Sequence, residues 1–299
     1  MVSPALRAAL EQHAREALGS DFRIQSVEPV RGGDINTALK LIGPGAAAFV
    51  KLRGADGEAM FAAEAASLAA LRTCSAIRTP EVLAHGSIED QTFLLLEWLD
   101  IQPIRSPETA RRAGEALSTL HRCTGEHFGW HHDNFLGNTP QTNPASDNWS
   151  RFFVQQRLLP QLERAARKGF GGDLQRDGER LCNRAPALFL EYAPQPSLLH
   201  GDLWSGNLGA LPDGTPVLFD PACYYGDRDT DLAMTELFGG LPMDFYVAYR
   251  SAWPLAEGYE QRKMLYNLYH VLNHLNLFGG GYLRQAERMA SQLAAELGR

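Results

Sequence analysis

The sequence predicts an α+β protein of two lobes, a small N-terminal lobe built on an antiparallel sheet and a larger, mainly helical C-terminal lobe. One observation is the length: 299 residues are enough for two domains of about 150 residues each. Another is the hydrophobic pattern, which changes near residue 99 from short β-like runs to a helical period. We therefore expect one lobe over residues 1–99 and the other over residues 100–299.

Composition narrows the possible partners. The chain is 44% hydrophobic and 21% charged, as ordinary globular proteins are. Its 28 basic and 35 acidic residues give a formal net charge of −7, which argues against nucleic acid because a phosphate backbone attracts a basic surface. Arg7 and Glu11 interrupt the apolar run that a secretory signal needs, and no later segment resembles a membrane span. We expect a cytoplasmic protein without a nucleic-acid or membrane partner.

The pattern of the four cysteines also agrees with a cytoplasmic protein. They are scattered along the chain without any CxxC pair, so their spacing indicates neither a zinc ribbon nor a disulfide framework. A reducing compartment fits this pattern best.

The N-terminal lobe should open with a helix over residues 3–18, because Ser3 supplies a capping hydroxyl before Pro4, which suits the first helical turn. Short β-like runs follow, and the turn sequences RGGD and GPG separate the first three. An alanine-rich segment then favours a helix by propensity. The expected elements are strands at 24–30, 35–42 and 46–52, a helix at 57–72, and strands at 82–88 and 91–99.

After residue 99 the helical period dominates. The expected helices are 106–122, 149–168, 174–191, 230–238, 244–252, 258–278 and 281–297. Residues 197–222 are the exception, because two apolar runs, a glycine-rich loop and a DG turn predict a small hairpin-like insert. The segment LEWLDIQPI joins the lobes without a flexible Gly/Ser tract, so we expect a shared cleft and a short hinge.

The insert contains the residues that indicate chemistry. Asp202 and Asn207 lie five positions apart within HGDLWSGN, and Asp220 follows thirteen positions later. Phosphoryl transfer needs a carboxylate near the attacking hydroxyl and hard oxygen ligands for Mg²⁺. These side chains supply that set, although Asp and Asn in a glycine-rich loop also commonly make turns. We predict Asp202 as the base or hydroxyl-orienting group, and Asn207 and Asp220 as Mg²⁺ ligands.

Two upstream side chains add a candidate phosphate site for ATP. Lys51 ends the third strand, where a lysine would reach the α- and β-phosphates, and Glu64 on the next helix could orient it through an ion pair. Either residue alone would be an ordinary solvated surface residue. Their order before the HGD segment favours the functional interpretation.

Backbone groups complete the candidate nucleotide site. Gly32 and Gly33 lie between the first two strands, where their N–H groups could approach phosphates, although the same sequence also makes an ordinary hairpin turn. Glu97, Trp98 and Leu99 end the fifth strand, where main-chain groups would meet adenine. An ordinary strand exit is the alternative for these three residues.

The order and spacing of these residues resemble those of protein kinases, in the HGDxxxxN form of the aminoglycoside-phosphotransferase-like kinases. From end to end, the chain resembles the bacterial-type branch of the fructosamine kinase (ketosamine kinase) family, within the protein-kinase-like superfamily. The most specific stretches are LLHGDLWSGNLG and FDPACYYGDRDTDLAMTELFGG. Support comes from GGDIN, FVK, FLLLEWL, FGWHHDNFLGNTPQ, NWSRFFVQQRLLPQL and YHVLNHLNLFGGGY.

The resemblance implies a two-lobed protein-kinase-like fold. It also implies ATP-dependent phosphorylation of a sugar hydroxyl on a ketosamine, the rearranged product of lysine glycation, as in deglycation repair. Two alternatives stay open: another small-molecule kinase acting on an aminoglycoside, choline or a simple sugar, and a catalytically silent nucleotide-binding or scaffold protein. The chain departs from some relatives at Asp34, where they carry an oxidation-sensitive cysteine. We expect Asp34 to cap its turn.

Substrate contacts are predicted at Trp204 and Asp227. Trp204 can stack on the apolar face of a sugar or on the linker to an amine, with core packing as the alternative. Asp227, with Asp229 and Asp231, can offer an acidic patch to the ammonium of a ketosamine. Asp231 can instead brace the catalytic loop, as an Asp after the metal segment does in related kinases.

Histidines form two further groups. The first lies within HRCTGEHFGWHHD, which lacks the ligand spacing of a metal site, so we favour a substrate-loop or surface role for His121, His127, His131 and His132. His270 and His274 lie four positions apart on a predicted helix without the glutamate of HExxH. We expect these two to pack in the core or to line a pocket.

Overall fold

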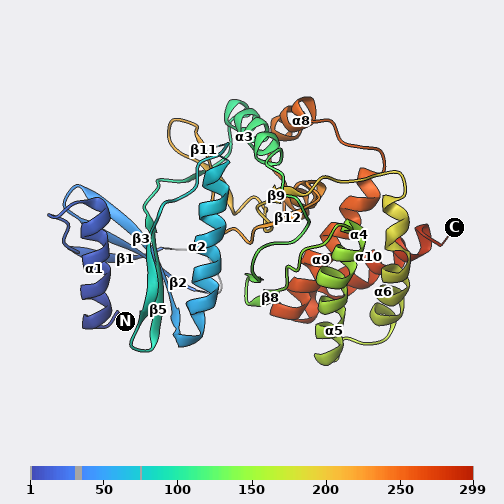
Figure 1. Cartoon of the computed structure of the whole chain (residues 1–299), viewed down its shortest axis with the longest axis horizontal. Coiled ribbons are helices and arrows are strands. Elements are labelled where there is room, and N and C mark those ends of the chain that lie inside the picture. The colour runs from blue at the N-terminus through green and yellow to red at the C-terminus, as the bar shows by residue number, and fades with distance from the viewer. Residues whose placement is uncertain (1, 31–35, 75, 299) are drawn as a thin grey trace.

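The computed structural model describes residues 2–30, 36–74 and 76–298. In Figure 1, the sheet lies on one side of the molecule with one helix on each of its faces. Most of the other helices form a group on the opposite side of the molecule. The sheet has five antiparallel strands in the order β1-β2-β3-β5-β4. The α+β architecture expected from the sequence, with a small sheet lobe and a larger helical lobe, is confirmed. The division of the chain at residues 99 and 100 stays a prediction.

The N-terminal lobe follows the predicted order of elements. Its helices are α1 (Pro4–Leu18) and α2 (Glu58–Thr73), with a short 3₁₀ turn η1 (Ala55–Gly57) before α2. Its strands are β1 (Ser26–Pro29), β2 (Thr37–Gly43), β3 (Ala46–Gly54), β4 (Val82–Ile88) and β5 (Gln91–Glu97). Alternation along the strands buries both faces, because Leu95 packs in the cluster that contains α1 residues and Leu94 in the cluster that contains α2 residues. The two helices therefore cover opposite faces of the sheet (Figure 1).

The C-terminal lobe is mainly helical, as expected. Its helices are α3 (Pro107–Leu120), α4 (Trp149–Phe153), η2 (Val154–Leu158), α5 (Leu159–Arg167), α6 (Asp173–Arg184), η3 (Ala185–Phe189), α7 (Asp229–Leu237), α8 (Met243–Ala252), α9 (Tyr259–Phe278), η4 (Gly280–Tyr282) and α10 (Leu283–Glu296). Its short strands are β6 (Gln102–Pro103), β7 (Asn134–Leu136), β8 (Thr139–Gln141), β9 (Ser197–Leu199), β10 (Leu208–Ala210), β11 (Pro216–Leu218) and β12 (Tyr224–Gly226). Within the described ranges, no helix has both the length and the apolar character needed to cross a bilayer.

The predicted insert contributes strands to two small antiparallel sheets and does not form one hairpin alone. β10 and β11 make the hairpin expected around the DG turn, and β6 adds to the other edge of β10. β9 pairs instead with β12. Consequently the loop at 200–207 joins two different small sheets, and residues 219–223 return the chain from β11 to β12. These two connections carry the predicted catalytic and metal-binding side chains.

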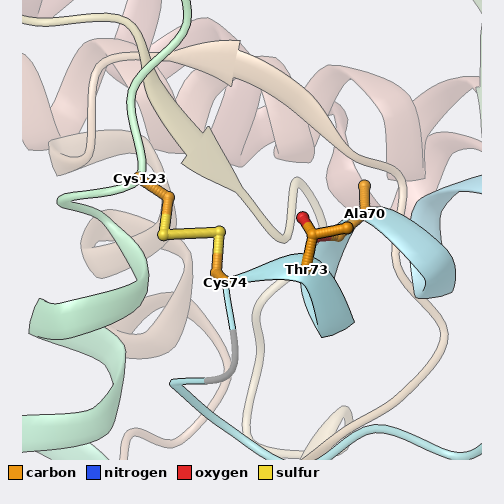
Figure 2. Close-up of a disulfide and its surroundings, with 4 residues drawn as sticks. All are labelled: Ala70, Thr73, Cys74 and Cys123. Atoms are coloured by element: carbon orange, nitrogen blue, oxygen red, sulfur yellow. A yellow bond between two sulfur atoms is a disulfide. The ribbon is translucent and has the colours of Figure 1, made fainter.

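A disulfide joins Cys74 to Cys123 (Figure 2), with the two Cα atoms 6.2 Å apart. Cys74 directly follows α2, and Cys123 lies shortly after α3, so the bond connects a helix of the sheet lobe to the helical lobe. The cysteine spacing gave no sign of a disulfide, and for this pair that interpretation was wrong. The reason is physical: the two residues are 49 positions apart, and only tertiary packing brings them together. Cys182 and Cys223 are buried and unlinked.

Loss of this disulfide should lower the free energy of unfolding by about 2–4 kcal/mol, because the cross-link restricts the unfolded chain. Urea unfolding of the wild-type protein, with and without a reductant, measures the effect. The double variant Cys74→Ser/Cys123→Ser is the control. Its free energy of unfolding should equal that of the reduced wild type and should not change when the reductant is added. Equal stability of oxidised and reduced wild type would contradict the expectation.

Candidate active site

A cavity of about 1100 Å³ lies between the two lobes and gathers most of the predicted site residues. The sheet lobe contributes β3, α2 and the end of β5, and the helical lobe contributes the two connections of the insert. The predicted residues in its lining are Lys51, Glu64, Glu97, Trp98, Leu99, Asp202, Trp204, Asn207 and Asp220. Gly32, Gly33 and Asp34 lie outside the described residues, so their predicted roles stay predictions.

Lys51 faces the cavity because of strand alternation. Val50 and Leu52 point into the core under α1, which turns Lys51 to the opposite face. Its Nζ lies 2.6 Å from Glu64 Oε1 and 2.6 Å from Asp220 Oδ1. Burial alone would lower the pKa of Lys51, but the carboxylates of Asp220 and Glu64 outweigh it and raise the pKa above its ordinary value. A charged ammonium is thus held in the wall of the cavity, with Asp220 as a second partner that the sequence did not suggest.

Asp202 and Asn207 are linked across the loop between β9 and β10. Asn207 Nδ2 donates to the Asp202 backbone oxygen at 2.9 Å and approaches Oδ2 at 3.3 Å. Burial, followed by the nearby carboxylates of Asp220 and Asp231, raises the pKa of Asp202 to about 7. A carboxylate with a pKa near neutrality is well matched to accepting a proton from a substrate hydroxyl.

Asp231, in the first turn of α7, supports the backbone of this loop through hydrogen bonds. Its Oδ2 accepts a hydrogen bond from His200 N at 2.7 Å, and its Oδ1 accepts one from Gly201 N at 2.9 Å. His121 Nε2 lies 3.2 Å from Oδ2. Burial would raise the pKa of Asp231, but the hydrogen bond and charge of His121 and the other partners lower it. Of the two roles considered for Asp231, bracing the catalytic loop fits these contacts.

Gly201 has no room for a side chain. Its φ is +82°, in the region that favours glycine, and a Cβ there would lie 2.1 Å from the Ala222 backbone oxygen. The close approach fixes the catalytic loop against the β11–β12 connection. This packing explains why a glycine must precede Asp202.

Asn207 and Asp220 present the oxygen donors that Mg²⁺ prefers. The Asn207 amide nitrogen is used by Asp202, so its Oδ1 remains for another partner. Asp220 pairs with Lys51 through Oδ1, yet its side chain is 43% exposed in the cavity. Its backbone has a φ of +58°, which is uncommon for a residue other than glycine. One amide and one carboxylate fit a cation that takes its remaining ligands from water and phosphate oxygens.

The residues expected to meet adenine line the cavity at the end of β5. The Glu97 carboxylate accepts hydrogen bonds from Arg78, so its side chain is already engaged. The ammonium of Lys40 lies 4.0 Å from the centre of the Trp98 ring. Leu99 follows and also lines the cavity. Main-chain contact between these residues and adenine stays a prediction.

Trp204 belongs to the cavity and not to the core. It is 39% exposed and lines the cavity beside Asp202. Its ring lies against Gly206, where an added Cβ would come within 2.2 Å of it. Core packing, the alternative considered for Trp204, is therefore excluded, and contact with a substrate stays a prediction.

Asp227 does not reach the cavity. It is fully buried, its Oδ1 accepts a hydrogen bond from Tyr192 OH at 2.9 Å, and its Oδ2 accepts one from Tyr266 OH at 2.6 Å. Asp229 is buried as well, and it pairs with Arg262 at 2.9 Å. The predicted substrate contact at Asp227, and the acidic patch that included Asp229, were wrong. Internal hydrogen bonds engage both carboxylate oxygens of Asp227 and Oδ2 of Asp229.

The histidines of residues 121–132 do not share one environment. His121 is fully buried, with Nδ1 2.7 Å from Tyr249 OH, so its role is to support Asp231 and not to form a surface loop. His127 is exposed and contacts Asp147. The substrate-loop or surface role that we favoured agrees with the exposed position of His127, but it was wrong for the buried His121.

Aromatic residues that the sequence did not single out also line the cavity. They are Phe238 after α7, Phe278 at the end of α9 and Tyr282 in η4. His274 lines the cavity beside them, and His270 is buried one turn earlier. The i, i+4 spacing of His274 and Phe278 could have indicated a shared helix face.

The raised pKa of Asp202 predicts a pH-dependent activity. Below a pH of about 7 the carboxyl should hold a proton and fail as a base, so kcat/KM should rise with pH and level off above this value. The measurement is kcat/KM for the sugar substrate from about pH 5.5 to about pH 9 at constant ionic strength. A profile that stays flat between these limits would contradict a base with this pKa.

Comparison with known proteins adds independent information. Residues 6–296 match the family described as Fructosamine kinase. A probable ketoamine kinase of Synechocystis sp. is 45% identical over 291 residues, which cover 97% of this chain and 97% of that protein. The solved structure of a candidate fructosamine-3-kinase from Haemophilus somnus 129PT has a TM-score of 0.87 and 30% identity, covering 95% of this chain and 96% of that one.

A more distant structure supports the fold. An aminoglycoside phosphotransferase, solved in a ternary complex with AMP-PNP and hygromycin B, has a TM-score of 0.63 at 13% identity and covers 96% of this chain and 98% of its own. At that identity the likeness shows the fold alone, and the protein-kinase-like fold expected from the sequence is confirmed. The family match over residues 6–296 and the identity to the Synechocystis protein show that this chain is a phosphotransferase of the fructosamine kinase family.

Proposed function

We propose that this protein transfers the γ-phosphoryl group of ATP to a sugar hydroxyl of a ketosamine, such as a fructosamine or ribulosamine adduct of lysine. The proposal rests on the observation that Lys51, Asp202 and Asp220 line one cavity between the lobes. The names of the relatives, ketoamine kinase and fructosamine-3-kinase, support the substrate class. We also propose a deglycation role for this activity and a cytoplasmic location, both of which were expectations from the sequence.

ATP would enter beside the sheet lobe. Lys51, held by Glu64, directs its positive charge into the cavity, where α- and β-phosphates would be bound. The AMP-PNP in the related aminoglycoside phosphotransferase supports a nucleoside triphosphate as the donor. Asn207 and Asp220 would hold Mg²⁺, which supplies charge neutralisation on the phosphates during transfer.

Asp202 would act on the acceptor. Its carboxylate would orient the sugar hydroxyl and accept its proton as the oxygen attacks the γ-phosphorus of ATP, whose bond to the β–γ bridging oxygen breaks so that ADP leaves. Asn207 fixes the side chain by the contact at Oδ2, and Asp231 fixes the backbone of the loop. The reacting groups lie in the cavity between the lobes, where bound ATP and sugar would displace water.

The metal assignment predicts that Asp220→Asn lowers activity and raises the Mg²⁺ concentration needed for half-maximal rate, because one formal charge leaves a hard-cation site. Asn207→Ala should act in the same direction, more weakly. Magnesium titrations of the initial rate measure both effects, with the exposed Asp21→Asn as the control for loss of a carboxylate elsewhere. Unchanged titrations in both variants would show that the metal is bound by other residues.

A substrate panel tests the proposed function. ADP release is measured at matched concentrations of fructosyl-lysine, ribulosyl-lysine, free ketoses, choline and an aminoglycoside. We expect the two ketosamines to be the best substrates, the free ketoses to follow, and choline and the aminoglycoside to be poor. Efficient turnover of choline or the aminoglycoside, with both ketosamines at background, would overturn the proposal in favour of another small-molecule kinase. Turnover with none of them would favour a silent nucleotide-binding protein.

A further inference from the structure

Four aromatic side chains gather at the helical-lobe end of the cavity, and we call Phe238, His274, Phe278 and Tyr282 the aromatic subsite. The His274 ring is central, with ring centres at 4.7 Å from Phe238, 5.4 Å from Phe278 and 5.2 Å from Tyr282. Phe278 is 50% exposed although it is a large apolar residue. The subsite therefore presents aromatic surface to the cavity that the protein itself does not cover.

Local sequence explains how the subsite is built. His274 and Phe278 lie four residues apart on α9 and so share one face of that helix. Gly279, with a φ of +91°, ends α9, and the 3₁₀ turn that follows brings Tyr282 back toward the same face. Phe238 comes from a different helix, because it directly follows α7.

α7 also connects the subsite to the catalytic loop. Asp231, which braces that loop, lies seven residues before Phe238, a rise of about 10 Å along a helix. α7 packs against α9, so the two aromatic contributions come from helices fixed to each other. The subsite thus lies at a defined separation from the groups that would act on the sugar.

None of the four side chains of the aromatic subsite is permanently charged, so none of them repels a cation. Elsewhere in the described lining of the cavity, Lys51 is the single ammonium, and it pairs with Glu64 and Asp220. Burial lowers the pKa of His274, so this ring is neutral near pH 7 and does not repel a positive charge. The faces of aromatic rings attract cations through their quadrupoles.

We propose that the aromatic subsite binds the alkylammonium arm of the ketosamine, the part beyond the reacting sugar, through cation–π and apolar contacts. The inference rests on the proposed function and deepens it, because it names the feature that separates a ketosamine from a free ketose. It also replaces the expected attraction by Asp227, which is buried away from the cavity. Trp204 would remain on the sugar side, beside Asp202.

Phe278→Leu tests the subsite, because leucine keeps much of the apolar volume and removes the ring. We expect KM for fructosyl-lysine to rise about 10-fold with kcat little changed, the size of a partly desolvated cation–π contact. KM for ATP and for a free ketose should stay near the wild-type values, and Phe278→Tyr should restore most of the affinity for fructosyl-lysine. Leu190→Ala, which truncates another exposed apolar side chain outside the cavity, is the matched control.

Direct binding separates failure of the subsite from failure of the proposed function. Titration calorimetry of fructosyl-lysine into the wild-type protein and into Phe278→Leu requires no turnover. If the wild type binds the compound more tightly than the variant but does not phosphorylate it, the subsite stands and the proposed function falls. If the wild type phosphorylates it and the variant has the same KM, or loses affinity equally for the free ketose, the subsite is overturned. Absence of both binding and turnover in the wild type would overturn both.

Discussion

Asp202→Asn should lower kcat by about 10²–10⁴-fold, the usual cost of losing a general base. The substitution keeps the size of the side chain and its contact with Asn207, but it removes the charge that accepts the proton of the sugar hydroxyl. Nucleotide affinity should change little, because Lys51 and Asp220 remain in place. Steady-state ADP release gives kcat, and calorimetric titration with a non-hydrolysable ATP analogue gives the affinity.

The environment of Asp202 lets this experiment separate a catalytic defect from loss of stability. Burial raises the pKa of Asp202, so the neutral amide should be accommodated without loss of stability, and unfolding in urea should show a variant at least as stable as the wild type above a pH of about 7. With that stability measured, a reduced rate is assigned to the lost carboxylate and not to unfolding. Turnover close to the wild-type value would remove Asp202 from the mechanism.

Lys51→Met should lower kcat/KM for ATP by about 10²–10³-fold, the usual loss when one charged group that stabilises the transferred phosphoryl is removed. The same variant should be less stable by about 3 kcal/mol, because it leaves the buried Glu64 carboxylate without its cation. Burial already raises the pKa of Glu64 against the opposing charge of Lys51, so this carboxyl should take up a proton in the variant. The loss of stability should accordingly be smaller at acidic pH than at pH 8.

A double variant separates the two effects of Lys51. Lys51→Met/Glu64→Gln removes the buried charge together with its partner, so urea unfolding should show most of the stability restored. Activity should remain low, because the ammonium that binds the phosphates is still absent. Recovery of activity along with stability would mean that Lys51 serves only to hold the fold together.

The parts of the site that could be predicted from the sequence depend on short-range geometry. Asp202 and Asn207 lie on one loop, so their spacing alone indicates that they are neighbours. Lys51 and Glu64 lie on a strand and on the helix that follows it, where alternation along β3 and packing of α2 fix which faces meet. The sheet, its inserted helix and the helical lobe follow from the same periodicities.

The parts that could not be predicted depend on tertiary burial and long-range contact. Asp227 looks like an available carboxylate in the sequence, but Tyr192 and Tyr266 come from distant segments to bind it. Cys74 and Cys123 carry no spacing signal, since the ends of α2 and α3 meet only in the folded chain. The aromatic subsite likewise draws its rings from α7, α9 and η4.

The most direct test of the central claim is the product formed from fructosyl-lysine, ATP and Mg²⁺. Mass spectrometry of the reaction with the wild-type enzyme should show fructosyl-lysine carrying one added phosphoryl group, in an amount equal to the ADP released. Asp202→Asn should give only a trace of this product under the same conditions. ADP release without a phosphorylated ketosamine, or equal product from Asp202→Asn, would contradict the assignment of this cavity as a ketosamine kinase site.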